Sequence, residues 1–318
     1  KKYIETSAKL LSYCIKYDSL LVLDTKMKPE DKDKEHKIYQ PKGVNSAIQL
    51  LQAAQNYSNS ENQEELKQGA KYAEIFINAM ENSNLMKDFK HAELEGWKTY
   101  SKAFRAQSYL NIEGTPEETI VNAYKALFNT NFKGIAYQSL MNYYREKDKA
   151  KQNLYLQEGI DALKGDAEQK DLRANFVTIL MQNQFQAGDK EGFMKTAEIM
   201  KTEFADDENA VNAYLMEGQF AFEAKDYETA KKAFLAGSEK YPDDEKCLLM
   251  AARSAWMKAQ TTGSKKEDMN EAITLFKKLE AANPESPELW GESLYVLYNN
   301  TQQPKLAANY KKYYKSNK

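Results

Sequence analysis

A pattern of two small residues, an aromatic residue and a proline occurs in the C-terminal half of the chain, at Gly218, Ala230, Phe234 and Pro242. Its last three members recur at Ala272, Phe276 and Pro284. In both copies the last three members stand 4 and 8 residues apart, and the first copy opens with an interval of 12. A unit that recurs along a chain buries its apolar face against its neighbours, so the pattern indicates an array of packed units. Such an array favours a binding scaffold and says little about the partner.

The segment 213–242 resembles one tetratricopeptide repeat, a helix–turn–helix unit of about 34 residues. Tyr214 stands where the family has its first aromatic residue, and Gly218 stands where a small residue lets the first helix approach the second. Pro242 ends the unit because proline cannot continue a helix. The 42 residues from Pro242 to Pro284 correspond to one repeat with an insertion. The resemblance is firm over about a third of the chain and extends to the rest by continuity.

The resemblance implies an all-α fold, a right-handed solenoid of antiparallel helix pairs. The residues themselves also predict helices, because apolar positions recur at helical spacing and the strand pattern of alternating Val, Ile and Thr is almost absent. We expect a first helix over 2–23 and helix pairs over 44–81, 87–128, 131–164, 168–204, 207–241, 243–282 and 286–316. Short turn residues separate helices at Gly165-Asp166, Gly188-Asp189 and Lys225-Asp226, where Asp can cap the following helix.

The expected organisation has three parts in one continuous solenoid. Residues 1–43 form an N-terminal helix plus a charged loop, residues 44–166 form divergent helical repeats, and residues 167–318 form repeats like those of the tetratricopeptide family. The loop prediction rests on segment 24–43, which is highly charged and contains Pro29 and Pro41. We interpret this segment as a solvated insertion in preference to a lid over a binding site.

Charge argues against a nucleic-acid partner, and hydropathy argues against a transmembrane segment. The formal net charge is −2, and only four of the 45 basic residues are Arg: Arg105, Arg145, Arg173 and Arg253. Nucleic-acid-binding proteins usually carry a net basic surface and use Arg for bidentate contacts, so we expect no nucleic acid. No run of about 18 apolar residues occurs, so we expect no transmembrane segment.

The cysteines and the start of the chain leave the compartment open. Cys14 and Cys247 are far apart in the sequence, and in a solenoid they would be far apart in space, so we expect two buried free thiols and no bridge. The chain begins at Lys1 without Met, which leads us to expect a removed secretory signal or a trimmed chain. We favour the periplasm or envelope slightly over the cytoplasm. The abundance of Lys, Tyr and Asn resembles repeat proteins of the Bacteroidetes.

The residues that usually perform catalysis are sparse. Of the two histidines, His36 lies in the charged segment, and His91 is followed by Glu95 at the spacing of an ordinary helical surface pair. No nucleotide-binding, dinucleotide-binding or zinc motif occurs, and His and Cys do not cluster. Paired carboxylates sit at predicted helix starts, where the helix dipole explains them. We therefore expect no catalytic residues, no metal and no cofactor.

A ligand groove is the better candidate for function. In the family that the chain resembles, the first helix of each repeat lines the concave face. Carrying that register from Gly218 places an aromatic column beside a hydrogen-bonding column: Phe185, Phe222, Trp256 and Tyr298 beside Gln182, Gln219, Arg253 and Tyr295, with Asn212 and Lys246 also facing inward. The partner-binding residues implied are Gln219, Phe222, Arg253, Trp256, Tyr295 and Tyr298, because aromatic residues and Arg are enriched at binding hot spots. The alternative, that the aromatic residues form the core inside each repeat, stays open.

Three hypotheses follow, in order of preference. The first is a non-catalytic scaffold that binds a protein or peptide partner in its concave groove. The second is a helical-repeat protein of the bacterial envelope that binds a small molecule or glycan. The third is an enzyme on a helical scaffold, which ranks last because no cluster of ionisable residues stands out.

Overall fold

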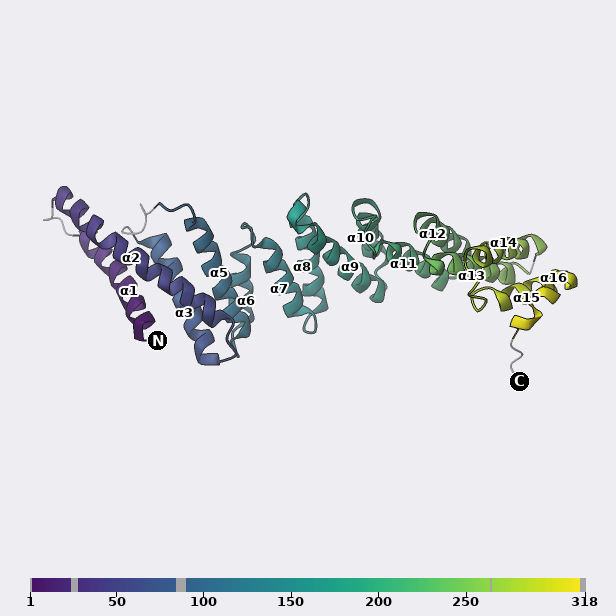
Figure 1. Cartoon of the computed structure of the whole chain (residues 1–318), viewed down its shortest axis with the longest axis horizontal. Helices are drawn as coiled ribbons and strands as arrows, with labels where there is room; N and C mark the ends of the chain where they lie inside the picture. The colour runs from purple at the N-terminus through teal and green to yellow at the C-terminus, as the bar shows by residue number, and fades with distance from the viewer. Residues whose placement is uncertain (1, 24–27, 84–89, 264, 315–318) are drawn as a thin grey trace. The chain divides into compact units, whose positions relative to one another are not determined.

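The computed structural model describes residues 2–23, 28–83, 90–263 and 265–314, with the backbone alone for residues 2, 14–23, 33 and 35–42. Every regular element in these ranges is a helix (Figure 1). The predicted all-α class is therefore confirmed for the described part of the chain. Within the same ranges, no helix combines the length and the apolar character needed to cross a bilayer.

The chain packs as two units, residues 1–169 and 170–318. The helices of unit 1 are α1 (Lys2–Leu23), α2 (Pro29–Ser58), α3 (Gln63–Asn82), α5 (Leu94–Asn111), α6 (Glu117–Lys125), α7 (Lys133–Tyr144) and α8 (Lys149–Ala162), followed by a short 3₁₀ helix, Ala167–Gln169. The helices of unit 2 are α9 (Lys170–Gln186), α10 (Lys190–Glu203), α11 (Ala210–Glu223), α12 (Tyr227–Lys240), α13 (Glu245–Thr261), α14 (Lys266–Ala282), α15 (Gly291–Asn300) and α16 (Pro304–Tyr310), with a final 3₁₀ helix, Lys311–Tyr313. Inside each unit, helices that follow one another in the sequence pack against each other, which confirms the predicted sequential helix pairs.

The predicted loop at 24–43 is wrong for most of its length. Residues 24–27 lie outside the described part of the chain, but α2 begins at Pro29 and includes the remainder of the segment. Pro29 occupies the first turn, where its missing N–H is not needed, and Glu30 and Asp31 follow it at the positive end of the helix dipole. Of the two prolines interpreted as loop residues, Pro29 is therefore a helix start and Pro41 lies within α2, as does His36.

The helix pair α11–α12 is held together by a very close approach at Gly218. A Cβ atom added there would lie 2.5 Å from Cε1 of Phe234, so only glycine leaves room for that ring. Ala230 and Phe234 of α12 are buried, and Ala272 of α14 is buried at the equivalent place in the next pair. The sequence prediction is confirmed for the contact between Gly218 and Phe234 and for the burial of Ala230 and Ala272.

The turn inside each helix pair of unit 2 has one residue in the left-handed backbone region: Gly188 (φ 70°), Lys225 (φ 60°), Gly263 (φ 81°) and Gln302 (φ 57°). In three of these turns the next residue donates its N–H to the carbonyl five positions earlier, which is the hydrogen bond of a Schellman motif: Asp189 to Gln184, Asp226 to Ala221 and Gln303 to Tyr298. The same turn geometry thus recurs from pair to pair, although glycine occupies it only twice.

Two of these turns also start the next helix, as predicted. The side chain of Asp189 accepts the N–H of Gly192 at 2.9 Å, and that of Asp226 accepts the N–H of Thr229 at 3.1 Å. Asp166 has another role, because its carboxylate pairs with Lys133 at 3.1 Å. The insertion between Pro242 and Pro284 partly lengthens helices, since α13 and α14 each have 17 residues against 14 in α11 and α12.

Glu117 links three consecutive helices of unit 1. Its Oε1 accepts hydrogen bonds from the hydroxyl of Tyr144 on α7 at 2.8 Å and from Nζ of Lys151 on α8 at 2.6 Å. These two donors hold the pKa of the Glu117 carboxyl below its ordinary value. The contact orients α6, α7 and α8 around the buried Tyr144 ring.

An ion-pair network links α12, α13 and α14 in unit 2. Nζ of Lys231, whose side chain is only 7 % exposed, lies 2.9 Å from Glu228 and 2.6 Å from Glu271. Nζ of Lys258 lies 2.9 Å from the same Glu228 carboxylate and 3.5 Å from Asp268. Hydrogen bonds from Lys258 and Lys231 lower the pKa of Glu228 to about 2.

We expect Ala230→Leu to lower the free energy of unfolding by about 1–3 kcal/mol, because added methyl groups would overpack the buried contact between α11 and α12. The matched control is Ala236→Leu, at an exposed position on the same helix, which should change stability by no more than about 0.5 kcal/mol. Urea titrations of both variants measure the difference. Equal stabilities would show that the helix-pair contact is misplaced.

The Glu228 network should make stability depend on pH. Because the folded-state pKa is below the ordinary value of 4.5, the carboxylate contributes stability fully above about pH 4.5 and loses it as the pH falls toward 2. Glu228→Gln should therefore be less stable than the wild type at pH 7, and the difference should shrink between pH 4.5 and 2. Glu239→Gln, at an exposed residue of the same helix, is the control. A pH-independent difference would contradict this role of the ion pairs.

Candidate ligand groove

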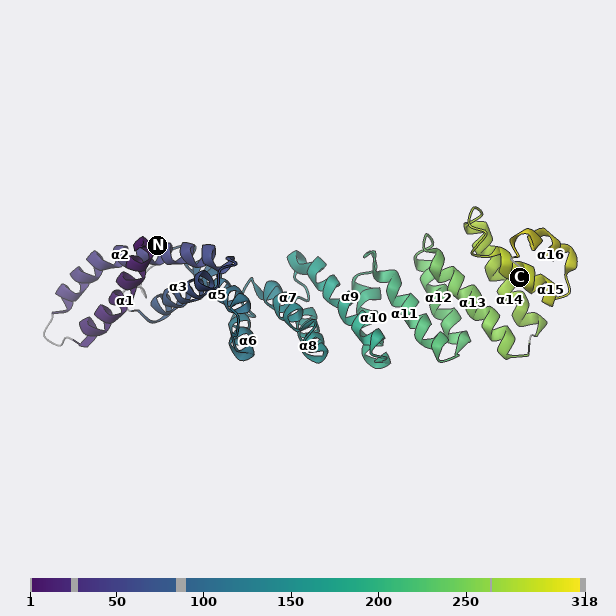
Figure 2. The ribbon, with the colours of Figure 1, turned by 90° about the horizontal axis from the view of Figure 1, so that it is seen from below.

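A groove of about 440 Å³ opens in unit 2 along α9, α11 and α13, which alternate with α10 and α12 in Figure 2. Phe185 of α9 and Phe234 of α12 contribute to its walls, and the remaining lining residues come from α11 and α13: Asn212, Leu215, Met216, Gln219, Lys246, Leu249, Met250 and Arg253. This volume lies within the range of about 300–1,000 Å³ that is usual for ligand sites. We call this feature the α11–α13 groove.

The lining repeats in both position and chemistry. On α11, Asn212, Leu215, Met216 and Gln219 follow the i, i+3, i+4, i+7 spacing of one helix face. On α13, the residues 34 positions later take the same places: Lys246, Leu249, Met250 and Arg253. Each helix therefore contributes a Leu-Met floor with a polar residue at either end.

The electrostatics of the α11–α13 groove favour anionic groups. Its lining contains two cations, Lys246 and Arg253, and no carboxylate. Neither cation has an ion-pair partner within the described part of the chain, and both side chains are exposed. The side-chain amide nitrogen of Gln219 donates to Oε1 of Glu223 at 2.8 Å. The side-chain oxygen of Gln219 therefore stays available as an acceptor. Arg253 can bind a carboxylate through two parallel hydrogen bonds, and such charge-assisted bonds are among the stronger ones in proteins.

Some of the predicted site residues meet in this groove. Gln219 and Arg253 line it together with Asn212, Lys246 and Phe185, all of which had been assigned to the inward face. Gln182 is exposed on α9 and does not belong to the lining. Two of the four members of the hydrogen-bonding column, Gln219 and Arg253, are thus brought together over α11 and α13.

Three of the four rings of the predicted aromatic column, all except Phe185, lie elsewhere. Phe222 packs edge-on against Tyr227 at 5.1 Å between ring centroids, and Trp256 packs edge-on against Phe276 at 6.1 Å. Tyr298 is buried and stacks on Tyr310 at 5.7 Å. Each of these contacts joins the first and second helices of one pair, so these three rings contribute to intra-pair packing.

Tyr295 is half-buried beside Tyr314, at 4.7 Å between ring centroids, and does not line the groove. The displacement of Phe222 and Trp256 has a geometric cause. A residue three positions after Gln219 or Arg253 is rotated by about 60° around the helix, which turns it toward the second helix of the pair. The Leu-Met floor was not among the predicted site residues, although the 34-residue recurrence of its positions was visible in the sequence.

Other reactive groups have structural surroundings. His91 accepts the N–H of Glu93 at 3.1 Å and stacks on Trp97, while Glu95 pairs with Lys98. Cys247 is a buried free thiol whose pKa is raised to about 12 by burial and by Asp244, so it is a poor nucleophile at neutral pH. The side chain of Cys14 lies outside the described residues. Among the side chains that the structure describes, no three His, Cys, Asp or Glu residues gather as a metal site would require.

Comparison with known proteins adds no relative. A scan against protein-family models finds no matching family, and a search of curated proteins finds no matching relative.

Proposed function

We propose that this chain is a non-catalytic scaffold of the tetratricopeptide kind, a right-handed solenoid that binds a protein or peptide partner in the α11–α13 groove. The observation that carries the proposal is the lining itself. Two helices present the same four positions 34 residues apart to one open surface. The length of that interval is the length of the family's repeat, about 34 residues.

The recurrent turn supports the repeat architecture. Left-handed residues at Gly188, Lys225, Gly263 and Gln302 stand at the same place in four successive helix pairs. Equal turns give successive pairs similar internal geometry, so the first helices present equivalent faces. A chain built in this way displays a row of side chains that can follow an extended or helical peptide.

The groove chemistry indicates which peptide fits best. Leu215, Met216, Leu249 and Met250 offer an apolar floor, and methionine side chains adapt to differently shaped apolar groups. Lys246 and Arg253 flank that floor without carboxylates in the lining. A segment with one or two apolar side chains and neighbouring Asp or Glu residues would therefore bury apolar surface and gain charge-assisted hydrogen bonds.

We expect selection from a random peptide library against the full chain to enrich sequences that combine apolar and acidic residues. Arg253→Glu should weaken the selected peptides by about 30-fold, which corresponds to about 2 kcal/mol of binding free energy. Fluorescence anisotropy of a labelled peptide measures the change.

Lys278→Glu is the matched control, because it reverses an exposed cation on α14 away from the groove. It should leave the affinity within about twofold, and circular dichroism should show both variants to be folded. Peptides that bind both variants as tightly as the wild type would contradict binding in the α11–α13 groove.

A further inference from the structure

The α11–α13 groove extends along the two helices that form it. Its lining runs from Asn212 to Gln219 on α11 and from Lys246 to Arg253 on α13. Both helices run in the same direction, because α12 returns between them. With a rise of about 1.5 Å per residue, the lining follows each helix for about 10 Å. An occupant that covers the whole lining therefore lies along the helices and not across them.

The lining is polar at each end and apolar between the ends. Lys246 stands at one end of the α13 face and Arg253 at the other, and both side chains are exposed. Between them, Leu249 and Met250 are half-buried, as are the Leu and Met at the equivalent positions of α11. Two cations thus stand about 10 Å apart along the helix axis, at the two ends of an apolar floor.

This arrangement favours a helical occupant over an extended one. An extended segment lying along the groove would place main-chain N–H and C=O groups over Leu and Met side chains, which carry no hydrogen-bond donor and only a weak sulfur acceptor. Leaving such groups unpaired away from water costs free energy. An α-helix pairs its main-chain groups internally, so it can lay an apolar face on the floor without that cost.

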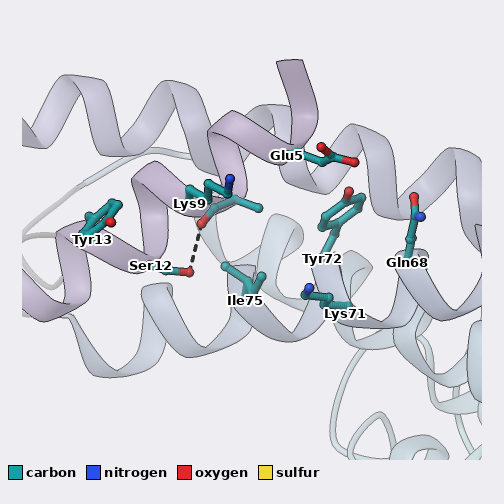
Figure 3. A pocket seen from close by; sticks show the side chains of 9 residues that line it. Glu5, Lys9, Ser12, Tyr13, Gln68, Lys71, Tyr72 and Ile75 are labelled. Atoms are coloured by element: carbon teal, nitrogen blue, oxygen red, sulfur yellow. Dashed lines mark hydrogen bonds between the residues drawn. The ribbon is translucent and has the colours of Figure 1, made fainter. Parts of the chain in front are cut away.

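The cavity between α1 and α3 in unit 1, of about 620 Å³, differs from this groove in its charge (Figure 3). Glu5, Lys9 and Lys71 line it, and all three side chains are exposed. In Figure 3 the Glu5 carboxylate lies over the Tyr72 hydroxyl, and Lys9 lies nearer Ile75. Exposed charges of both signs therefore share this lining, whereas the α11–α13 groove presents one sign only. Charge complementarity thus selects a partner at the α11–α13 groove and none at this cavity.

We propose that the partner segment in the α11–α13 groove is an amphipathic α-helix with acidic residues at positions i and i+7 and apolar residues at i+3 and i+4. This inference rests on the proposed function, since it names the form of the peptide that the groove binds. On one face of a helix these four positions span the same length as the lining. The two carboxylates then reach Lys246 and Arg253, and the two apolar side chains pack on the Leu-Met floor.

The test is fluorescence anisotropy of labelled synthetic peptides with the full chain. The reference peptide has about 16 residues on an alanine-rich background, with Glu at i and i+7 and Leu at i+3 and i+4. In the second peptide the Glu at i+7 exchanges places with the Ala at i+5, which moves the carboxylate off the face without changing composition. In the third, Pro replaces the Ala at i+5 and breaks the helix. In the fourth, Glu at i and i+3 flank two Leu, which sets the carboxylates about 10 Å apart only in an extended chain.

We expect the reference peptide to bind and each of the other three to bind at least about 10-fold more weakly. Circular dichroism should show that the reference peptide gains helix on binding. A third or fourth peptide that binds as tightly as the reference would overturn the helical form. A second peptide that does so would overturn the alignment of acidic residues at i and i+7.

Variants locate the two ends of the bound helix. Lys246→Glu and Arg253→Glu should each weaken the reference peptide by at least about 10-fold. Lys278→Glu, at an exposed residue of α14 outside the lining, should leave its affinity within about twofold. A peptide with Lys in place of one Glu should prefer one of the two groove variants, and a peptide with Lys in place of the other Glu should show the reverse preference. No such reversal would contradict the pairing of two carboxylates with two cations.

Failure of this inference and failure of the proposed function give different results. If peptides selected from the library bind and Arg253→Glu weakens them, but the reference peptide does not bind at millimolar concentration, the function stands and the helical form is wrong. If neither the selected peptides nor the reference peptide binds in the groove, both are wrong.

Discussion

The close approach of α11 and α12 at Gly218 is the contact on which the arrangement of unit 2 depends. The Phe234 ring occupies the volume that any other side chain at Gly218 would need. Ala230 and Phe234 of α12 are both buried. An adjacent face of α11 meets α13, and the α11–α13 groove forms along that face, with Phe234 contributing to its wall.

Turn geometry carries this packing from one pair to the next. The left-handed residue at each turn reverses the chain within a few residues, and at α10 and α12 the following Asp caps the new helix. Lys225 and Gln302 accept a backbone conformation that glycine adopts more readily. The Schellman hydrogen bonds at these two turns offset the conformational free energy that a non-glycine residue loses in this backbone region. Between α12, α13 and α14, the ion pairs of Lys231 and Lys258 add a link that does not depend on apolar contacts.

The helix pairs and the buried contacts could be predicted from sequence because small residues and breakers mark them directly. Gly218 and Ala230 have few roles in a helix other than close packing, and Gly188-Asp189 has few roles other than a turn. The aromatic residues gave no such signal, since Trp256 and Tyr298 are equally suited to a groove and to a core. Their placement depends on a rotation of about 60° around each helix, which sequence spacing does not resolve. Pro29 was misjudged because proline favours a helix start as much as a loop. The cavity between α1 and α3 forms between two helices that α2 separates in the sequence, so no local sequence pattern predicts it.

The most direct test of the account is a double-mutant cycle between Gly218→Ala and Phe234→Leu, with the free energy of unfolding as the measured quantity. If the Phe234 ring fills the space above Gly218, Gly218→Ala should cost about 1–3 kcal/mol in the wild type. In the Phe234→Leu background it should be neutral or stabilising, because alanine favours the helix more than glycine does. The predicted coupling is therefore at least about 1 kcal/mol. Additive effects, within about 0.5 kcal/mol, would contradict the close approach of the two helices.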